Sequence, residues 1–548
     1  MSTETTDGTT DTGSHSPEGH AKPIHGFEPL KLRLFRDLWI ASTVSNLGSW
    51  MQDTAGTWLM AVLTPSPLLI ALMQTAASLP ILILGLVAGA TADIFDRRRL
   101  LLFWQAWMLG AVALLSVLTF FDIISPWALL TLTFLLNIGS AMNSPAWQAI
   151  FPELVPRSQL PDAISLNSAG FNLARAVGPA LGGLAVAAFI HADTGAGSVF
   201  LLNSLSFVGV ILVLYRWQRK PLFKSALPTE RIFGSMRSGI RYMRYAPALQ
   251  AVLLRTLVFT FFVSAVWALL AVVAQRDLHG ALGGALGYGI LNGSMGLGAV
   301  IGATSLPRVR RLTSADGIIN GSTLVFIVTL AVLGLIRQPW IIIPVLVAGG
   351  FAWTSAMSTM NLAVQISVPA WVQARALGTY QTTFAGGMAV GSVIWGFVAE
   401  HVSTPKALVS AAVGLAVSLP FALRFHVLRG EQPDLSPHQY TVPAPEFALE
   451  REDDVGPIRV SIDYYIDPQD YDAFIHAIYR LRAVRLRDGA IRWGVYQDME
   501  NPHHVTETFI TESWLEYLRQ RERFTASDRE IRDKVWSYHR GDDPPRSS

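Results

Sequence analysis

The chain has 548 residues, of which 51% are hydrophobic and only 15% are charged, and its mean hydropathy is positive, at +0.37. Soluble proteins carry charge on about a quarter of their residues, so this composition indicates a membrane protein rather than a large soluble one. The absence of cysteine excludes disulfides and thiolate metal sites. Residues 1–429 hold 27 Lys and Arg against 17 Asp and Glu, whereas residues 430–548 hold 15 against 23. The C-terminal segment is therefore a different kind of polypeptide.

In chain order, residues 1–36 are polar and lack hydrophobic periodicity, which predicts a disordered N-terminus rather than a signal peptide. Twelve apolar segments follow, several of them longer than the roughly 20 residues that a helix needs to cross a bilayer. Six fall within residues 37–216 and six within residues 248–428, and a basic linker, residues 217–247, joins them. The segments lie near residues 38–63, 67–92, 100–121, 126–151, 163–190, 196–216, 248–275, 284–306, 317–336, 339–365, 376–401 and 405–428.

The distribution of basic residues tests this number of spans and sets their direction. If the N-terminus is cytoplasmic, the cytoplasmic segments carry 22 Lys and Arg, and the outside loops carry three, namely Arg276, Arg337 and Lys406. Adding or removing one span would destroy the alternation. The sequence therefore predicts a polytopic protein of twelve transmembrane helices in the inner (cytoplasmic) membrane, with both termini in the cytoplasm.

A short pattern occurs twice at a constant offset. The segment GATADIFDRR at residues 89–98 aligns without a gap with GATSLPRVRR at residues 302–311. The same offset aligns Pro156 with Pro369, Ala163 with Ala376, Phe171 with Phe384, Gly178 with Gly391 and Gly183 with Gly396. Such a series predicts two six-helix repeats in parallel orientation, an architecture known among secondary transporters.

The first copy of this pattern, Gly89-x-x-Ala92-Asp93-x-x-x-Arg97-Arg98, resembles the signature of the major facilitator superfamily between its second and third helices. The segment GPALGG at residues 178–183 resembles that superfamily's antiporter motif in the fifth helix. Longer segments, such as SNLGSWMQDTAGTWL and NSPAWQAIFPELVP, resemble the secretion-effector branch, which includes enterobactin exporters. The resemblance covers about residues 30–428 and implies the major facilitator fold and secondary active transport.

The resemblance further implies that Gly89, Asp93, Arg97 and Arg98 form a conformational lock at the cytoplasmic side. Asp93 would face the positive N-terminal end of a helix in the other half, or pair with Arg97 or Arg98. The alternative is that the arginines only fix the membrane topology. The second copy of the pattern carries Leu306 in place of the aspartate, so only the first half keeps the acidic member.

The antiporter motif consists of Gly178, Pro179, Gly182 and Gly183. A proline bends a helix, and glycines let a neighbouring backbone approach closely. We therefore expect this helix to form a functional interface at the boundary between the halves. The alternative is ordinary helix packing by small residues.

Asp53 lies in the middle of the first span, where a carboxylate is expensive unless it faces a cavity or a partner. Arg175, in the fifth span, is the proposed countercharge, and the two residues are candidates for proton coupling. The alternative is a static pair that holds the helices in register. Arg255, in the seventh span, is expected to extend toward the nearby membrane edge.

Several polar amides and tryptophans occur at a similar depth in the predicted helices, and they suggest an apolar cavity with a few convergent polar groups. Asn143 and Gln148, on either side of Pro145, are the candidates for substrate binding. Each of the other amides is more readily explained as an interhelical hydrogen bond. The wider set comprises Asn46, Asn137, Asn167, Asn172, Asn292, Asn361, Gln381, Trp50, Trp58 and Trp353.

Residues 429–457, rich in proline and acidic residues, are a predicted linker, and residues 458–540 have the pattern of a small cytoplasmic α+β domain. Strands are expected at 458–466, 490–498 and 504–510, a helix at 468–489, and one or two helices after the N-cap Ser513. This order resembles the ferredoxin-like fold of dimeric α/β-barrel monooxygenases. We expect a docking, dimerising or regulatory role for this domain.

A catalytic role for this domain would require His476, His503 or His504. Successive side chains on a strand point to opposite faces, so His503 and His504 do not readily line one pocket. The sequence contains no phosphate-binding loop and no metal-ligand spacing. We therefore expect a protein that is not an enzyme and that needs no cofactor, no metal and no nucleic acid.

Taken together, these patterns predict an exporter of a small organic compound, siderophore-like or drug-like, that works by alternating access and proton antiport. Its expected partners are the substrate, the proton and the lipid bilayer, with self-association or protein docking through the C-terminal domain. An importer and an uncoupled facilitator remain the alternatives within transport. A membrane-tethered, monooxygenase-like enzyme is the alternative outside it.

Overall fold

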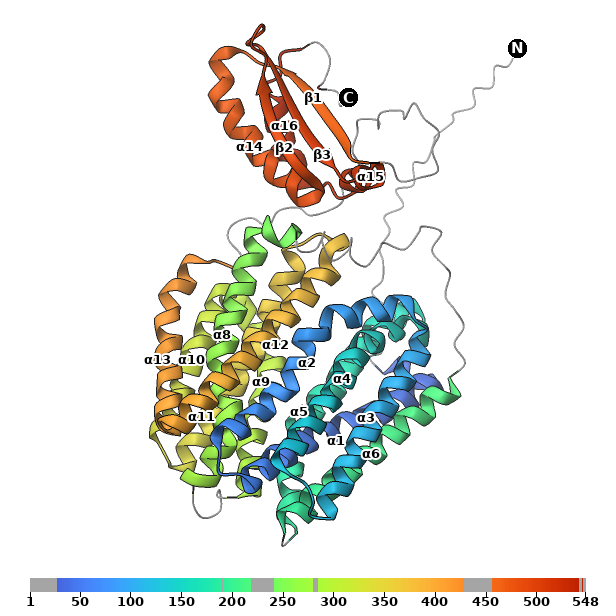
Figure 1. Cartoon of the computed structure of the whole chain (residues 1–548), viewed down its shortest axis with the longest axis vertical. Coiled ribbons are helices and arrows are strands. Elements are labelled where there is room, and N and C mark those ends of the chain that lie inside the picture. The colour runs from blue at the N-terminus through green and yellow to red at the C-terminus, as the bar shows by residue number, and fades with distance from the viewer. Residues whose placement is uncertain are drawn as a thin grey trace, which may run out of the picture.

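A computed structural model of the chain describes residues 27–189, 191–217, 241–278, 284–427, 456–541 and 545. Figure 1 shows two bundles of helices and a smaller domain that contains a sheet. Most of the predicted disordered N-terminus lies outside the described residues, as do the greater parts of the two predicted linkers, residues 217–247 and 429–457.

The first bundle, called the N bundle, consists of α1 to α6. Several of its helices start at a side chain that caps the first turn. Ser66 accepts a hydrogen bond from the backbone N–H of Leu69, and Asp96 accepts one from that of Arg99. The helices are α1 (Arg33–Leu63), α2 (Pro67–Ile94), α3 (Arg97–Phe120), α4 (Pro126–Leu154), α5 (Leu160–Ala187) and α6 (Ala192–Arg216).

The second bundle, called the C bundle, consists of α8 to α13. Its helices are α8 (Pro247–Val272), which continues into the π-helical turn Val273–Asp277, α9 (Ala285–Leu312), α10 (Ala315–Leu335), α11 (Pro339–Ile366), α12 (Ala370–His401) and α13 (Thr404–Arg424). Arg255 of α8 pairs with Asp316 and Asn320 in the first two turns of α10, and it is 5% exposed. That its side chain extends toward the membrane edge stays a prediction.

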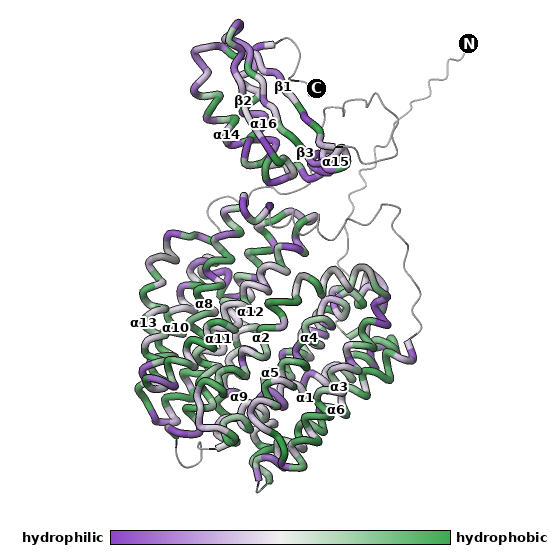
Figure 2. Tube along the Cα trace, in the orientation of Figure 1, coloured by the Kyte–Doolittle hydropathy of each residue, from purple (hydrophilic) through white to green (hydrophobic). Residues whose placement is uncertain are grey.

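Eight of the described helices are long and apolar enough to cross a membrane, which makes the chain a multi-pass membrane protein. Figure 2 shows hydrophobic residues along the helices of both bundles. The helices α1, α4 and α5 are not among the eight, and the apolar part of α13, Thr404–Pro420, is too short. The prediction of twelve spans in two repeats therefore stays a prediction.

The two bundles contact each other mainly along two helix pairs, α2 with α12 and α5 with α9. Within the N bundle, α1 packs against α5 and α6, and α4 packs against α2 and α3. Within the C bundle, α9 packs against α11, and α8 packs against α12 and α13. The contact between the bundles is therefore made mainly by α2, α12, α5 and α9. These two helix pairs set the distance between the bundles.

The C-terminal domain has the order of elements that the sequence predicts. It comprises β1 (Ile458–Tyr465), α14 (Tyr471–Asp488), β2 (Ala490–Gln497), β3 (His504–Thr511), α15 (Trp514–Glu522) and α16 (Ala526–Trp536). The strands form an antiparallel sheet in the order β1-β3-β2, and the predicted N-cap Ser513 accepts from the backbone N–H of Glu516. Val460 and Phe509 pair across the sheet and belong to the domain's own hydrophobic core.

The core of this domain also encloses a carboxylate. Glu507 of β3 is fully buried and accepts hydrogen bonds from Arg485 (3.1 Å), Trp493 (2.9 Å) and the Tyr464 hydroxyl (3.1 Å). A buried charge is tolerated when its hydrogen-bonding capacity is met in this way. The network therefore fixes α14 to all three strands.

The C-terminal domain docks on the C bundle through two arginines that each lie over an aromatic ring. Arg523 lies 4.5 Å from the ring centre of Trp371, at the start of α12, and Arg487 lies 5.4 Å from that of Tyr242. The rings of Trp371 and Tyr242 meet edge to face at 5.6 Å. Contacts of this kind contribute most when the cation is desolvated, and Tyr242 is 2% exposed.

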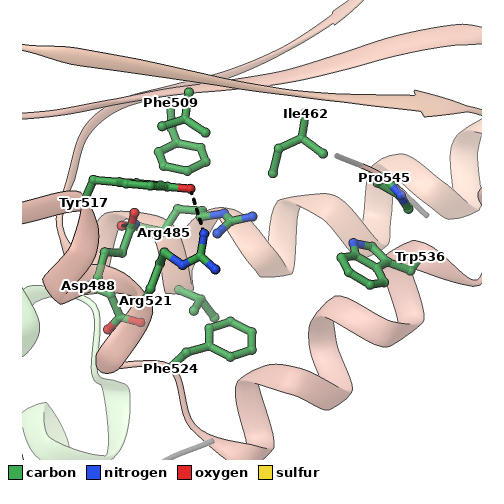
Figure 3. A pocket seen from close by; sticks show the side chains of 12 residues that line it. Ile462, Arg485, Asp488, Phe509, Tyr517, Arg521, Phe524, Trp536 and Pro545 are labelled. Atoms are coloured by element: carbon green, nitrogen blue, oxygen red, sulfur yellow. Dashed lines mark hydrogen bonds between the residues drawn. The ribbon is translucent and has the colours of Figure 1, made fainter. Parts of the chain in front are cut away.

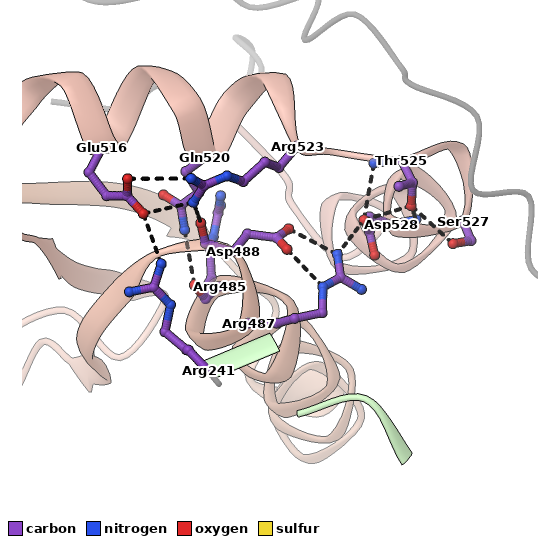
Figure 4. A network of polar contacts seen from close by, with 10 residues as sticks. All are labelled: Arg241, Arg485, Arg487, Asp488, Glu516, Gln520, Arg523, Thr525, Ser527 and Asp528. Carbon is purple, nitrogen blue, oxygen red and sulfur yellow. Dashed lines mark hydrogen bonds and ion pairs between the residues drawn. The ribbon is translucent and has the colours of Figure 1, made fainter. Parts of the chain in front are cut away.

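Carboxylates of the C-terminal domain hold these arginines in place (Figure 4). Arg487 donates to Asp488 at 2.7 and 2.9 Å and to Asp528 at 2.7 Å. Burial raises the pKa of Asp488 above its ordinary value, an effect that Arg487 opposes. The end of the segment that leads into α8 enters the same network. We name the end of the bundles that bears this domain the tail side, and the other end the far side.

Glu516 is the link between the domain and the bundle, because it binds arginines on both sides of the contact. It pairs with Arg241 at 2.8 Å and with Arg523 at 2.7 Å, and all three side chains are at most 14% exposed. We expect Glu516→Ala to release the domain, since it leaves two arginines without their carboxylate. Hydrogen–deuterium exchange of residues 241–246 and 514–523 should then speed up by about tenfold or more, which corresponds to about 1.4 kcal/mol.

The matched control is Asp533→Ala, which removes a carboxylate that also binds two arginines, Arg529 at 3.1 Å and Arg532 at 2.9 Å. Asp533 is 46% exposed and lies within α16, so its loss should leave exchange at residues 241–246 unchanged. Equal exchange in both variants would show that Glu516 does not hold the domain in place.

Candidate functional site

A cavity of about 800 Å³ lies within the membrane-spanning region and is lined almost entirely by the N bundle. Its wall comes from α1, α3, α4, α5 and α6, and α12 of the C bundle contributes Gln381. The lining residues are Ser42, Ser45, Asn46, Ser49, Trp50, Asp53, Gln105, Met108, Leu136, Asn137, Ser140, Asn143, Ser144, Trp147, Gln148, Phe151, Ile164, Asn167, Ser168, Phe171, Asn172, Phe207, Val210 and Gln381. This volume suits a mid-sized organic molecule.

Helical periodicity brings the polar residues of each helix to one face. On α1, Ser42, Ser45, Ser49 and Asp53 recur at intervals of three or four residues and so share one side of the helix. The polar residues of α4 and α5 follow the same spacing. A stripe of hydroxyls and amides on three neighbouring helices therefore produces one polar wall.

The cavity occupies the tail side of the N bundle. The starts of α8 and α12 lie at the tail side, since Trp371 contacts the C-terminal domain. The helix α2 runs antiparallel to α12 (Gly396 lies against Ala71, and Gly386 against Leu82), so α2 ends and α1 starts at that side. The lining residues of α1 begin near its start, at Ser42, and stop at Asp53. Asp53 therefore lies at the deep end of the cavity.

Both predicted substrate-binding residues line the cavity. Asn143 accepts a hydrogen bond from Gln105 at 3.5 Å, and Gln148 donates one to Ser144 at 3.5 Å. Such long bonds are weak and leave these amides available to another partner. The further predicted amides Asn46, Asn137, Asn167, Asn172 and Gln381 also line the cavity, whereas Asn292 and Asn361 do not.

Of the three predicted tryptophans, Trp50 alone lines the cavity. The ring of Trp58 stacks on Tyr288 at 6.2 Å. The ring of Trp353 lies 4.4 Å from that of Trp267, within an aromatic cluster of the C bundle. Trp58 and Trp353 therefore pack helices together and do not line this cavity.

The structure brings Asp53 to the cavity and Arg175 beside it. The Asp53 side chain is exposed and lines the cavity, whereas Arg175 stacks on Trp50, with its guanidinium carbon 5.7 Å from the ring centre. Trp50 in turn meets Phe171 edge to face at 6.1 Å. No hydrogen bond or ion pair joins Asp53 to Arg175 among the described contacts of these two residues. In this conformation Arg175 lies over the Trp50 ring, and Asp53, one helical turn from Trp50, does not bind Arg175.

The glycines of the antiporter motif lie at two different interfaces. A methyl group on Gly178 or Gly182 would come within 2.6 Å of Trp50 or Met51, so these glycines fit α5 against α1. A methyl group on Gly183 would lie 2.7 Å from the Cα of Gly289 in α9. Gly183 therefore belongs to the boundary between the bundles, and Gly178 and Gly182 pack helices inside the N bundle.

The residues of the predicted lock are distributed over the tail side of the N bundle. Arg97 donates to Glu153 at 2.9 Å, and Arg98 donates to the carbonyl O of Leu214 at 3.0 Å, at the end of α6. These bonds fix the start of α3 to α4 and α6. Gly89 lies in α2 with open space around it, and the side chain of Asp93 lies outside the described residues.

Sequence reasoning missed the serines and Gln105. The serines of α1, α4 and α5 are individually unremarkable in a membrane helix, but their three- and four-residue spacing continues the stripe of amides. That periodicity was the available signal. Gln105 is 5% exposed, and its Oε1 atom lacks a hydrogen-bond partner among the described residues. Nothing in the sequence around Gln105 distinguishes it from a packing residue.

The C-terminal domain contains a second, much smaller cavity of about 20 Å³ (Figure 3). It lies between the sheet and the helices, where Arg485, Tyr517 and Arg521 project into it, and its volume is that of about one water molecule. His476, His503 and His504 are not among its lining side chains. The two adjacent histidines have separate partners: His503 Nδ1 lies 3.1 Å from the Ile466 carbonyl O, and His504 Nε2 lies 3.1 Å from Asp463.

The contact at Gly183 can be tested through stability. Gly183→Ala places a methyl group 2.7 Å from two backbone atoms of α9, so we expect a loss of about 1–3 kcal/mol. Gly209→Ala in α6 meets nothing within 4 Å, and we expect it to stabilise its helix by about 0.5–1 kcal/mol. Thermal unfolding of the purified protein should therefore show shifts of opposite sign. Shifts of the same sign would contradict close packing of α5 on α9.

Comparison with known proteins agrees with this architecture. The chain is similar to the uncharacterized MFS-type transporter YfiS of Bacillus subtilis (30% identity; 44% of this chain, 57% of YfiS). It is similar to the staphyloferrin A transporter of Staphylococcus aureus (31% identity; 31% and 42%) and to macrolide efflux protein A of Streptococcus pyogenes (24% identity; 32% and 41%). The chain thus spans about half the length of the curated relatives it matches.

Solved structures show the same fold at low sequence identity. A crystal structure of the nucleoside transporter NupG superposes with a TM-score of 0.55 at 12% identity, over 72% of this chain and 100% of NupG. The family model described as transmembrane secretion effector matches residues 24–548, which is nearly the whole chain. The chain therefore belongs to the transmembrane secretion effector family of major facilitator transporters.

Proposed function

We propose that this membrane transporter exports a small organic compound from the cytoplasm by proton antiport. The observation that carries the proposal is the position of Asp53: a carboxylate at the deep end of a large polar cavity. Ionisable groups at membrane depth are expensive and mark ion or substrate pathways. A carboxylate there can bind a proton in one conformation and release it in another.

We further propose twelve spans in two six-helix repeats, in the inner (cytoplasmic) membrane, with both termini in the cytoplasm. The helices α1, α4 and α5 are the ones whose polar stripes line the cavity, and this accounts for their lower apolar content. The positive-inside distribution supports this orientation. The tail side is then cytoplasmic, and the conformation described is one in which the cavity lies toward the cytoplasm.

The lock at Gly89, Asp93, Arg97 and Arg98 remains part of the proposal. Arg97 and Arg98 are engaged with α4 and α6, which holds the start of α3 rigid. Gly89 faces open space, as expected when the cytoplasmic ends of the two bundles are apart. The lock would form when those ends approach.

Proton coupling is assigned to Asp53, with Arg175 as its electrostatic neighbour. Arg175 is held on the ring of Trp50, one helical turn from Asp53 on α1. A change in the tilt of α5 against α1 at Gly178 and Gly182 would move Arg175 relative to Asp53. The charge of Arg175 would then favour or disfavour the proton on Asp53 according to conformation.

The charge of the cavity favours some substrates over others. Asp53 carries the one charge among the described side chains that line it, and none of these side chains is Lys, Arg or His. An anion that has lost part of its hydration is unfavourable near a carboxylate without a bound cation. We therefore place drug-like cations and neutral, hydroxyl-rich compounds ahead of polyanionic siderophores, and Asn143 and Gln148 among their hydrogen-bonding partners.

Export rather than import is favoured by relatives named as efflux proteins, such as macrolide efflux protein A. An importer or an uncoupled facilitator would use the same cavity. The monooxygenase-like alternative gains no support from a C-terminal cavity with room for only about one water molecule. We propose that the C-terminal domain docks another protein. Self-association through this domain is a second role to examine.

Proton coupling is tested in an export-deficient bacterial host that accumulates fluorescent drugs. We expect the native protein to lower accumulation, and both a protonophore and Asp53→Asn to abolish this effect, because the variant cannot exchange a proton. Asp37→Asn is the matched control, since Asp37 lies on the same helix but outside the cavity and is 41% exposed. If Asp53→Asn transports at the native rate at equal expression, Asp53 is not the coupling residue.

Substrate charge is tested with purified protein in proteoliposomes. A panel of matched compounds would include a cationic drug, its neutral analogue and a polycarboxylate siderophore. We expect competition by the cation at roughly tenfold lower concentration than by the polycarboxylate, because the cavity lining offers the polycarboxylate Asp53 and no basic side chain. Stronger competition by the polycarboxylate would contradict the assignment of substrate class.

A further inference from the structure

At the far side, the turn between α1 and α2 is held by side chains of the C bundle. Gln275 donates from Nε2 to the carbonyl O of Ala61 at 2.5 Å, and Arg276 donates to the carbonyl O of Pro65. Both donors belong to the π-helical turn Val273–Asp277. The bundles are thus tied together at this end by polar contacts as well as by close packing.

The third contact comes from Glu400, in the last turn of α12. Its carboxylate accepts a hydrogen bond from the hydroxyl of Ser66 and another from the backbone N–H of Leu68 at 3.0 Å. Ser66 is the N-cap of α2 and accepts from Leu69 at 3.2 Å. The first N–H groups of a helix have no intrahelical partner and lie at its positive end. Glu400 therefore completes the cap of a helix in the other bundle.

The same two helices are in contact along part of their length only. From the far side, Gly396 lies against Ala71, Gly386 against Leu82, and Gly85 against Thr382. In this antiparallel register the next positions on α2 are Gly89, level with Gly378, and Asp93, level with Ala374.

A methyl group on Gly89 would meet nothing within 4 Å, whereas one on Gly85 would lie 3.5 Å from Thr382. The helices are therefore together from Glu400 to about Thr382 and apart beyond it. The register would bring Asp93 to the opening turns of α12 when the tail-side ends approach. Each helix thus has an acidic residue in its last turn, in register with the first turns of the other helix.

We propose that Glu400 is the latch that holds the far side closed while the cavity is open toward the tail side. When the far side opens, Glu400 must leave Ser66 and Leu68, since they belong to different bundles. This inference concerns the balance between conformations and requires neither a substrate nor a coupling ion. It therefore stands or falls independently of the proposed export.

The surroundings of Glu400 suit a contact that breaks and reforms. Glu400 is exposed, so water can replace its partners at small cost, unlike those of a buried ion pair. The neighbouring charges are Arg276, already bound to Pro65, and His401, whose Nδ1 lies 3.0 Å from the Phe397 carbonyl O. Glu400 is thus the one of these three side chains that binds the start of α2 itself.

The native chain contains no cysteine, so two introduced cysteines can carry spin labels without further changes. We choose Ile123→Cys in the N bundle and Leu335→Cys in the C bundle, which are 64% and 70% exposed at the far side. Full-length protein in lipid nanodiscs would be measured by double electron–electron resonance. The distance distribution reports the fraction of molecules whose far side is open.

We expect Glu400→Ala to raise the far-side-open fraction by about tenfold over the native background. Glu400→Gln keeps an acceptor oxygen but loses the charge, so we expect an intermediate increase. Ser66→Ala removes one partner and should also raise the fraction. The matched control, Asp193→Asn, removes a carboxylate from the first turn of α6 at the same side, without a contact across the bundles, and should leave the distribution unchanged.

An unchanged distribution in Glu400→Ala, with the variant monodisperse and of native thermal stability, would overturn the proposal. An equal increase in Asp193→Asn would do so as well, because it would show a general effect of charge at this side. If Glu400→Ala proves unstable, the comparison of Glu400→Gln with Ser66→Ala decides the matter. The proposal is then upheld only if both variants raise the far-side-open fraction.

Discussion

The close approach of α5 and α9 at Gly183 and Gly289 is the contact on which the other features depend. With backbone atoms only 2.7 Å from where a methyl group would lie, no side chain fits between these helices. The bundles are therefore closed at this level, and the cavity ends just on the tail side of it, at Asp53. Small residues let helices pack closely in a membrane, where the hydrophobic effect does not drive association.

Solvation by lipid explains why the polar residues gather in one place. A helix that carries serines, amides and a carboxylate cannot turn them toward hydrocarbon, so α1, α4 and α5 turn their polar stripes toward each other. The cost of these stripes is visible in the same three helices, which lack the apolar content of a simple span. The polar wall and the low apolar content of these three helices are thus two consequences of one arrangement.

The order of elements in the C-terminal domain could be predicted because it depends on local periodicity. Asn143, Gln148 and Asp53 could be singled out because polar groups are costly at membrane depth, whereas the serines of the polar wall were missed. Contacts between distant segments could not be predicted: Arg255 reaches Asp316, Arg97 reaches Glu153, and Glu400 reaches the start of α2. A long side chain has many partners within reach, and only the packing of the helices selects one.

The docked C-terminal domain makes the two ends of α12 unlike each other. At the far side, α12 ends in Glu400 and binds α2 directly. At the tail side, it starts with Trp371, which already carries Arg523 of the C-terminal domain. The contacts described for this domain are with Arg241, Tyr242, Tyr245 and Trp371, all of the C bundle or the segment leading into it. The domain is therefore anchored to the C bundle, and in the proposed conformational change α2 would approach a helix start that this domain already braces.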